Sequence, residues 1–92
     1  MGLRLYKNKR DASETAIVST LEAMGCSVYR LDKPVDLLIR IGTRSYLAEC
    51  KTGKGKLTQE QVKFMASGWE VWILRNEQDA VNMCNMIRRQ AA

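Results

Sequence analysis

Apolar residues recur along the chain at two different spacings, and the change from one spacing to the other marks the predicted elements. In the first segment Ile17, Leu21 and Met24 recur every three or four residues, which is the period of one helix face. Residues 11–14, Asp-Ala-Ser-Glu, have the form of a helix start, because a capping residue is followed three positions later by Glu. Gly25 is a typical helix stop, so a helix is predicted between residues 11 and 25.

Three short segments have the composition or the alternation of β-strands, namely 26–31, 35–41 and 46–51. The second of them alternates with a period of two, which predicts a single apolar face. This face is made of Val35, Leu37, Ile39 and Ile41. Residues 42–44, Gly-Thr-Arg, are typical of a hairpin turn, so the second and third strands are predicted to pair with each other.

The second half of the chain predicts a helix, a strand and another helix. Thr58-x-x-Gln61 is a capping box that opens a helix ending at Gly68. The apolar segment 69–74 predicts a buried strand, and a last helix begins within residues 76–79. Its apolar stripe consists of Ala80, Met83, Cys84 and Ile87. The resulting order, α-β-β-β-α-β-α, is that of an α/β fold.

Length and charge narrow the choice of partners. A chain of 92 residues allows one domain with one thin core. Its 15 Lys and Arg against 10 Asp and Glu give a net charge of +5, so a polyanion is the first partner to consider. Nucleic acid is favoured over a membrane surface, because no apolar run approaches the length of a membrane-spanning helix. We therefore expect no membrane partner.

Cysteine and histidine usage limits the chemistry. Cys26, Cys50 and Cys84 are odd in number and form no C-x-x-C motif, which is typical of free thiols in a reducing compartment such as the cytoplasm. Histidine is absent, which excludes the Ser-His and Cys-His nucleophile pairs and His-ligated zinc. Catalysis, if there is any, has to use carboxylates, lysines and a hard metal ion.

Asp36 stands out because it lies near the start of a strand otherwise made of Val, Leu and Ile. Glu49 and Lys51 are two positions apart on the next strand and so share a face, and hairpin pairing can bring Asp36 beside them. Two adjacent carboxylates repel each other unless Lys51 or a divalent metal lies between them. Mg²⁺ suits such a pair, since it takes oxygen ligands and typically adds substrate phosphate to one or two carboxylates. An ion-paired strand surface facing water is the alternative, and the pattern does not decide between the two.

Two helix residues are candidates for the same cluster. Glu14 lies at the inner edge of the apolar stripe of the first helix, and Gln61 precedes Phe64 and Met65 by three and four positions. Each is also the last residue of a capping box. A purely local capping role therefore stays open for both.

These residues carry a resemblance to a known family. The string from Pro34-Val-Asp36 through Glu49-Cys-Lys51 to Leu57-Thr-Gln-Glu-Gln61 resembles the VRR-NUC family of the PD-(D/E)xK nuclease superfamily, in the small stand-alone form found in phages and bacteria. The segment from Glu14 to Arg30 is similar to the first helix and strand of archaeal Holliday junction resolvases. The resemblance implies a restriction-endonuclease-like core over residues 1–92, with a mixed central sheet flanked by helices. The proline stands two residues before Asp36 rather than directly before it.

The resemblance also implies residue roles. The catalytic residues it implies are Glu14, Asp36, Glu49, Lys51 and Gln61. Lys51 would be the catalytic lysine, and Mg²⁺ or Mn²⁺ would be the cofactor. The implied metal ligands are Asp36, Glu49, the backbone carbonyl of Cys50, and Glu14 either directly or through water. Arg30 occupies the place of a resolvase arginine that contacts DNA.

The remaining basic residues predict a surface that binds phosphates without reading sequence. With Arg30, the expected DNA-binding residues are Arg10, Lys54, Lys56 and Lys63, and further candidates are Arg40 and Arg44. The leading hypothesis is a metal-dependent, structure-specific DNA endonuclease that resolves four-way (Holliday) junctions. The alternatives are a DNA nuclease without junction preference and a basic nucleic-acid-binding module without catalysis.

A homodimer is expected under the leading hypothesis, because resolving a junction takes two symmetric cuts and one domain holds one site. The candidate interface residues are Trp69, Trp72, Met83 and Met86. Core packing is the favoured alternative for Trp72 and an open one for Met83.

Overall fold

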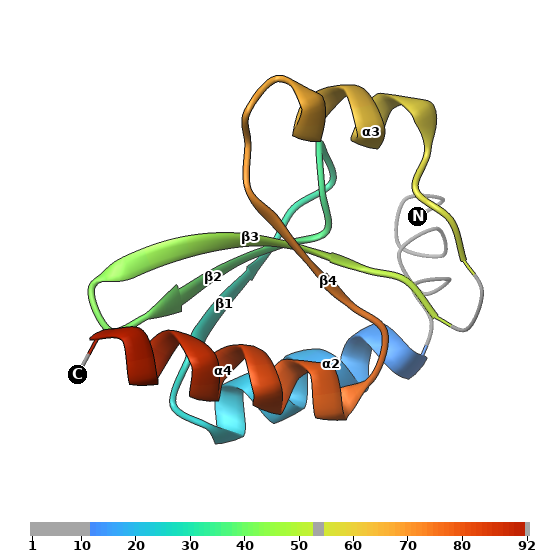
Figure 1. The fold of residues 1–92 in the computed structure, drawn as a ribbon. Helices are drawn as coiled ribbons and strands as arrows, with labels where there is room; N and C mark the ends of the chain where they lie inside the picture. Colours follow the sequence, from blue (N-terminus) through green and yellow to red (C-terminus); the bar gives the residue numbers. More distant parts are fainter. Residues whose placement is uncertain (1–11, 53–54, 92) are drawn as a thin grey trace.

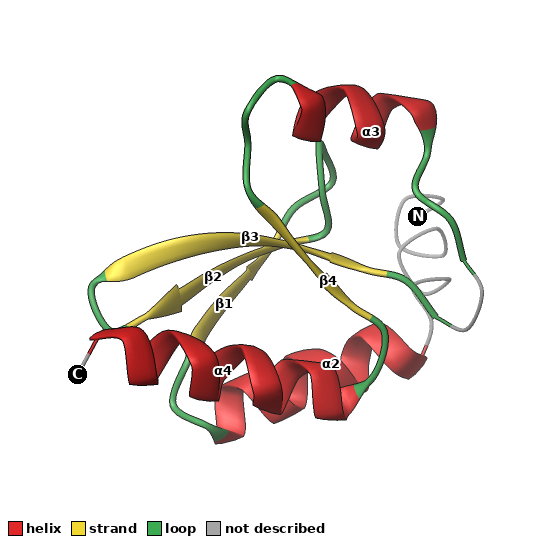
Figure 2. Cartoon of the chain, viewed as in Figure 1, coloured by secondary structure: helices red, strands yellow, loops and turns green. Residues whose placement is uncertain are grey.

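The computed structural model describes residues 12–52 and 55–91, which form an α/β fold with a four-stranded mixed sheet (Figure 2). The elements are α2 (Ala12–Ala23), β1 (Ser27–Arg30), β2 (Leu37–Ile41), β3 (Arg44–Cys50), α3 (Gln59–Ala66), β4 (Val71–Leu74) and α4 (Glu77–Ala91). The predicted α/β class, the mixed sheet and the predicted order α-β-β-β-α-β-α are therefore confirmed. Asp11, the predicted cap of the first helix, lies outside the described residues.

The strands lie in sequence order, β1-β2-β3-β4. β1 pairs antiparallel with β2 and β2 with β3, whereas β3 and β4 are parallel. Gly42 adopts a φ of 66°, which allows the two-residue connection between β2 and β3 and confirms the predicted hairpin. Parallel strands need a crossover, and α3 supplies it between β3 and β4. The carboxyl ends of β3 and β4 therefore lie at the same end of the sheet.

The two faces of the sheet are covered unequally. Helices α2 and α4 lie side by side on one face, while α3 lies across the other face near one end (Figure 1). The core fills the layer between the sheet and the α2–α4 pair. The apolar stripe predicted for the last helix is confirmed, because Ala80, Met83, Cys84 and Ile87 are all buried. None of the helices in residues 12–52 and 55–91 has the length and apolar character to cross a membrane.

The alternating face predicted for the second strand is also confirmed. Val35, Leu37, Ile39 and Ile41 are buried, and the intervening Leu38 and Arg40 are exposed. This alternation arises because successive side chains of a strand point to opposite faces, and only one face meets α2 and α4. The sheet register is fixed by this burial, since a shift of one residue would expose all four apolar side chains.

One prediction about apolar residues was wrong, and an alternative left open for another residue is decided by the structure. Segment 69–74 was expected to be buried, but Trp69 precedes β4 and is 57% exposed, and only Leu74 of the segment is fully buried. The reason is that β4 is an edge strand whose outer face is only partly covered. Met83 was a candidate for a subunit interface, but it is 1% exposed and belongs to the core. Trp72 also packs against the core, which was the favoured alternative for it.

Two cysteines far apart in the sequence meet beneath the sheet. The Sγ atoms of Cys26 and Cys84 lie 3.3 Å apart, and both side chains are buried. All three cysteines are free thiols, as predicted. Burial, together with the hydrogen bond and the charge of the neighbouring Cys26, raises the pKa of the Cys84 thiol to about 12, and the charge of Arg88 opposes the shift.

We predict that Cys84 makes the protein lose stability at alkaline pH. Between the ordinary thiol pKa of 9.0 and the folded value of about 12, the folded protein holds the Cys84 proton more tightly than the unfolded chain does. The free energy of unfolding should therefore fall as pH rises through this range, by roughly 1.4 kcal/mol per pH unit from this group.

Urea unfolding of the wild type and of Cys84→Ala between pH 8 and 11 measures this contribution. The Cys84→Ala variant should lose stability less steeply with pH than the wild type does. Ile87→Val is the control, because it weakens the same stripe of α4 without removing a titrating group and should keep the wild-type slope. Equal slopes for Cys84→Ala and the wild type would contradict the prediction.

Candidate active site

Asp36 and Glu49 hold each other at the end of the β2–β3 hairpin. The last pair in the backbone register is Leu37 and Ala48. At the next position, where Asp36 lies opposite Glu49, the two segments are joined by hydrogen bonds from backbone N–H groups to side-chain carboxylates. The backbone N–H of Asp36 donates to Glu49 Oε1 at 3.0 Å, and the backbone N–H of Cys50 donates to Asp36 Oδ2 at 2.9 Å. Each carboxylate thus accepts a hydrogen bond from the opposite strand, which fixes both acids at this end of the sheet.

Glu49 is buried among polar partners, with 3% of its surface exposed. Its Oε2 accepts a hydrogen bond from Gln61 Nε2 at 2.7 Å and lies 3.3 Å from Lys51 Nζ. Burial raises the pKa of Glu49, and the neighbouring Asp36 carboxylate raises it further. The hydrogen bonds from Gln61 and Lys51 and the charge of Lys51 lower it. Burial and the Asp36 carboxylate therefore destabilise the charged form of Glu49, and the donors Gln61 and Lys51 stabilise it.

Gln61 has two roles at once. Its Oε1 accepts from the backbone N–H of Thr58 at 3.0 Å, while Thr58 Oγ1 accepts from the backbone N–H of Gln61 at 3.1 Å. This is the predicted capping box, and the same Gln61 side chain donates through Nε2 to Glu49. The two alternatives left open by the sequence therefore both apply, because the two ends of one amide serve different partners.

Glu14 reaches the site from the helix layer on the opposite face of the sheet. It is 5% exposed, and its Oε2 lies 3.7 Å from Arg30 Nε. A carboxylate oxygen of Glu14, one of Asp36 and the Sγ of Cys50 all lie within 4.8 Å of one another. Because Cys50 and Glu49 are neighbours in β3, their side chains point to opposite faces of the sheet. Asp36 lies close to both of them, since its N–H donates to Glu49 and its carboxylate lies near the Cys50 thiol.

Two of the three side chains in this cluster, those of Glu14 and Asp36, have ligand atoms that suit a hard cation, and the third, Cys50, does not. The carboxylates of Glu14 and Asp36 are ligands that Mg²⁺ and Mn²⁺ accept, whereas a thiol is a softer ligand that suits other metals. The backbone carbonyl of Cys50 is an alternative oxygen donor. It points toward β2, because the N–H and C=O of one strand residue face the same neighbour, and the Cys50 N–H already bonds Asp36. Glu49 is not one of the three residues whose ligand atoms lie within 4.8 Å of one another, although it is a neighbour of both Asp36 and Cys50.

The predicted DNA-binding residues are distributed unevenly around the site. Arg30 lies next to Glu14, with 40% of its side chain exposed. Lys56 lies in the loop before α3 and Lys63 on α3, and both are exposed. Arg10 and Lys54 lie outside the described residues. Arg40 and Arg44 are exposed but lie on the hairpin toward the opposite end of β3 from Glu49.

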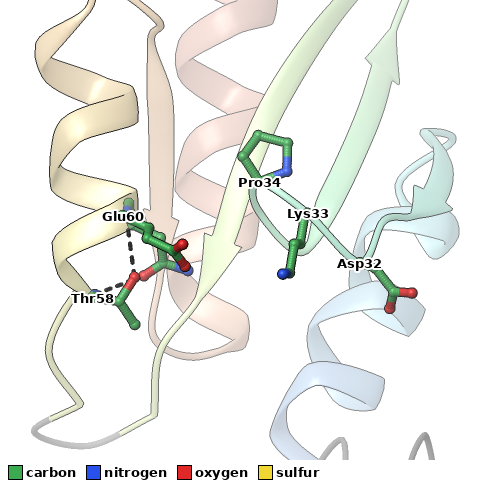
Figure 3. A pocket seen from close by; sticks show the side chains of 6 residues that line it. Asp32, Lys33, Pro34, Thr58 and Glu60 are labelled. Carbon is green, nitrogen blue, oxygen red and sulfur yellow. Dashed lines mark hydrogen bonds between the residues drawn. The ribbon is translucent and has the colours of Figure 1, made fainter.

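Two basic residues near the site were not among the candidates. Lys33 lines a cavity of about 310 Å³ between the β1–β2 loop and the start of α3 (Figure 3). Thr58 and Glu60 line its helix side, and Gln61 links it to Glu49. Arg75 follows β4, and its Nη1 donates to the carbonyl of Gly55 at 3.0 Å. The sequence could have indicated Arg75. It follows the strand β4 as Lys51 follows β3, and residues that follow neighbouring parallel strands lie at the same edge of the sheet.

Comparison with known proteins yields no relative from which to transfer a role. No family model, curated protein or solved structure matches the chain. A function is therefore inferred from the side chains of this site and their contacts.

We predict that Gln61→Glu destabilises the protein in a pH-dependent way. The introduced carboxyl can still cap α3, since Glu is accepted at this position of a capping box. It loses the hydrogen bond to Glu49 and adds a like charge, which raises the pKa of Glu49 further. The free energy of unfolding should fall by about 1–3 kcal/mol at neutral pH. The loss should shrink as the carboxyls protonate below pH of about 5.

Urea unfolding at pH 7 and pH 4.5 measures this effect. Gln59→Glu is the matched control, because Gln59 is an exposed residue of the same helix end and has no contact with Glu49 among the hydrogen bonds of the described residues. It should lose no stability at either pH value, because a carboxylate in the first turn of a helix is favourable or neutral. A loss that is the same at both pH values in Gln61→Glu would contradict the electrostatic explanation.

Proposed function

We propose that the chain is a metal-dependent DNA endonuclease of the PD-(D/E)xK type, related to the VRR-NUC family, that hydrolyses phosphodiester bonds. The observation that carries this proposal is the convergence of Glu14, Asp36, Glu49 and Lys51 from both faces of the sheet onto one end of the β2–β3 hairpin. The buried Glu49 beside the half-buried Asp36 and Lys51 carries a desolvation cost, which an ion-paired strand surface facing water would not carry. Such a cost is expected where the groups perform chemistry.

Glu14, Asp36 and the carbonyl of Cys50 would hold the metal, which we propose to be Mg²⁺ or Mn²⁺. When bound, such an ion polarises a phosphodiester and lowers the pKa of a water molecule. The two carboxylates are suited to it because they lie close together and are held by the fold rather than by the ion. Arg30 would balance the charge of Glu14 and face the phosphate backbone.

Lys51 would act directly at the scissile phosphate. Its Nζ lies 3.3 Å from Glu49 Oε2 and its side chain is 18% exposed, so the ammonium is held in place yet reachable from outside. From this position it can orient the attacking water or offset the negative charge that develops on the phosphate. Gln61 is a positioning residue, because it fixes Glu49, which in turn holds Lys51.

The charge of the chain supports a DNA substrate. Of the 15 basic and 10 acidic residues, Lys51 and the acids Glu14, Asp36 and Glu49 belong to the site, which leaves 14 basic and 7 acidic residues with a balance of +7. A surface of this sign attracts phosphates and reads no base sequence. We propose branched DNA, four-way junctions first, as the substrate and a homodimer as the active form.

A basic module that binds DNA without cutting it is the second candidate, and the basic surface alone would serve it equally well. The buried Glu49 with its donors Gln61 and Lys51 disfavours it, since phosphate binding needs none of these contacts. Cleavage assays on matched linear, flap and four-way DNAs in Mg²⁺, Mn²⁺ or EDTA distinguish the candidates and rank the substrates. A module would leave all of these DNAs intact.

We predict that Lys51→Ala abolishes cleavage and leaves DNA binding almost unchanged. The ammonium is expected to stabilise the transition state more than the bound substrate, so its loss should lower the cleavage rate by at least about 100-fold. The dissociation constant for DNA should change by no more than about twofold, because one of many basic groups is removed.

Single-turnover cleavage and a fluorescence-anisotropy titration of the same labelled DNA give the two values. Arg89→Ala, which removes an exposed cation from α4, is the control and should keep full cleavage. Undiminished metal-dependent cleavage by Lys51→Ala would refute the role given to this residue.

We also predict that Mg²⁺ or Mn²⁺ stabilises the wild type against unfolding. An ion that binds only the folded state adds about 1.4 kcal/mol at tenfold excess over its dissociation constant. For a domain of this size that amounts to a melting temperature higher by roughly 6–11 °C. Asp36→Asn should lose this response, although its side chain can still accept the hydrogen bond from Cys50.

Thermal unfolding with and without metal measures the response in the absence of DNA. Glu22→Gln removes an exposed acid from the same helix as Glu14 and should respond like the wild type. If Asp36→Asn were stabilised as much as the wild type, the ion would bind elsewhere.

A further inference from the structure

Cys26 and Cys84 are two nucleophilic side chains that the proposed chemistry does not use. Cys26 lies between α2 and β1, and Cys84 lies in the middle of α4, beside α2 (Figure 1). Their Sγ atoms are 3.3 Å apart. A disulfide joins its two sulfurs at about 2.0 Å, so these atoms would have to approach each other by only roughly 1.3 Å. The two thiols are therefore placed for bond formation.

The contacts around Cys26 hold it in this position. Gly25 ends α2 with a φ of 89°, and the backbone N–H of Cys26 donates to the carbonyl of Leu21 at 3.0 Å, which is the bond of a Schellman motif. From α4, Arg88 Nη2 donates to the carbonyl of Met24 at 2.5 Å and to Cys26 Sγ at 3.9 Å. The end of α2 is thus tied to α4, and the distance between the two thiols is set by the fold.

The exposure of the two thiols sets the order in which an oxidant meets them. Cys26 lies at the margin of the core and is 6% exposed, whereas Cys84 is 0% exposed. A reagent about as small as water can contact Cys26 first, and a bulky one is kept out by the surrounding side chains. Hydrogen peroxide, the smallest hydroperoxide, meets this requirement. Cys84 then lies behind Cys26 as the thiol that resolves the oxidised sulfur.

We propose that Cys26 and Cys84 are a redox-active pair that a hydroperoxide converts into a disulfide. First the sulfur of Cys26 attacks a peroxide oxygen, so that an S–O bond forms, the O–O bond breaks and water leaves, and Cys26 becomes a sulfenic acid. Then Cys84 Sγ attacks this sulfur, the S–S bond forms, the S–O bond breaks, and the hydroxyl leaves as water with the Cys84 proton. The thiols lose two electrons, and hydrogen peroxide is reduced to two water molecules.

The disulfide would stabilise the fold without reaching the acid site. It closes a loop from residue 26 to residue 84, which contains all four strands and α3. A cross-link over so long a loop restricts the unfolded chain and thereby favours the folded one. The strand register places the start of β1 at the hairpin end of the sheet, near Ser45, whereas Cys50 lies roughly 17 Å further along β3. The inference does not depend on the proposed function.

The first test identifies the bond. Reduced, folded wild type without metal or DNA is treated with hydrogen peroxide, and the remaining thiols are then alkylated in denaturant. We expect one alkylated cysteine, Cys50, in place of the three of the reduced protein. Mass spectrometry should find a tryptic product that links residues 11–30 to residues 76–88, each of which holds a single cysteine. Three alkylated cysteines, or a link through Cys50 instead, would overturn the proposal.

The second test measures the effect on stability. The oxidised wild type should melt at least about 5 °C higher than the same sample after dithiothreitol. This comparison isolates the disulfide, because dithiothreitol does not reverse the oxidation of methionine. Cys26→Ser should form no link and show no dithiothreitol-dependent shift. Cys50→Ser is the matched control and should keep both. A linked wild type that melts no higher would overturn the stabilising role, and the wild-type comparison decides alone should Cys26→Ser fail to fold.

Discussion

The pair of hydrogen bonds by which Asp36 and Glu49 each accept an N–H from the opposite strand is the constraint on which the site depends. It places two acids where the backbone pairing of β2 and β3 ends. Two like charges so close repel each other, and hydrogen-bond donors offset this repulsion. The donors are the N–H of Asp36, the N–H of Cys50, the amide of Gln61 and the ammonium of Lys51. Removing any one donor should therefore be felt by the rest of the group.

The local parts of this arrangement could be predicted from the sequence. Period-two burial around Leu37, the hairpin at Gly42 and the capping box at Gln61 depend on neighbours within a few residues, and all three are present. The nearness of Asp36 and Glu49 follows from the hairpin register, which the turn fixes.

What could not be predicted depends on how layers pack. The approach of Glu14 to Asp36 and the Cys50 thiol needs α2 to lie at a particular height on the sheet. The meeting of Cys26 and Cys84 requires α4 to lie beside α2. No periodicity along the chain encodes these heights. The burial predicted for the strand over 69–74 was wrong for a related reason, since an apolar strand at a sheet edge and one in its centre have the same pattern.

Helix α3 connects the two ends of the outer sheet face. Its first turn carries Gln61, which holds Glu49, and its Phe64 stacks on Trp69, which precedes β4. Yet none of its residues is fully buried, so within one chain it is held mainly by its capping box, by Gln61 and by partly buried side chains. Because the same helix presents Gln61, the donor to Glu49 is held by these few contacts. In a chain of 92 residues, with material for only one thin core, the order of the acid site therefore depends on the capping box of α3.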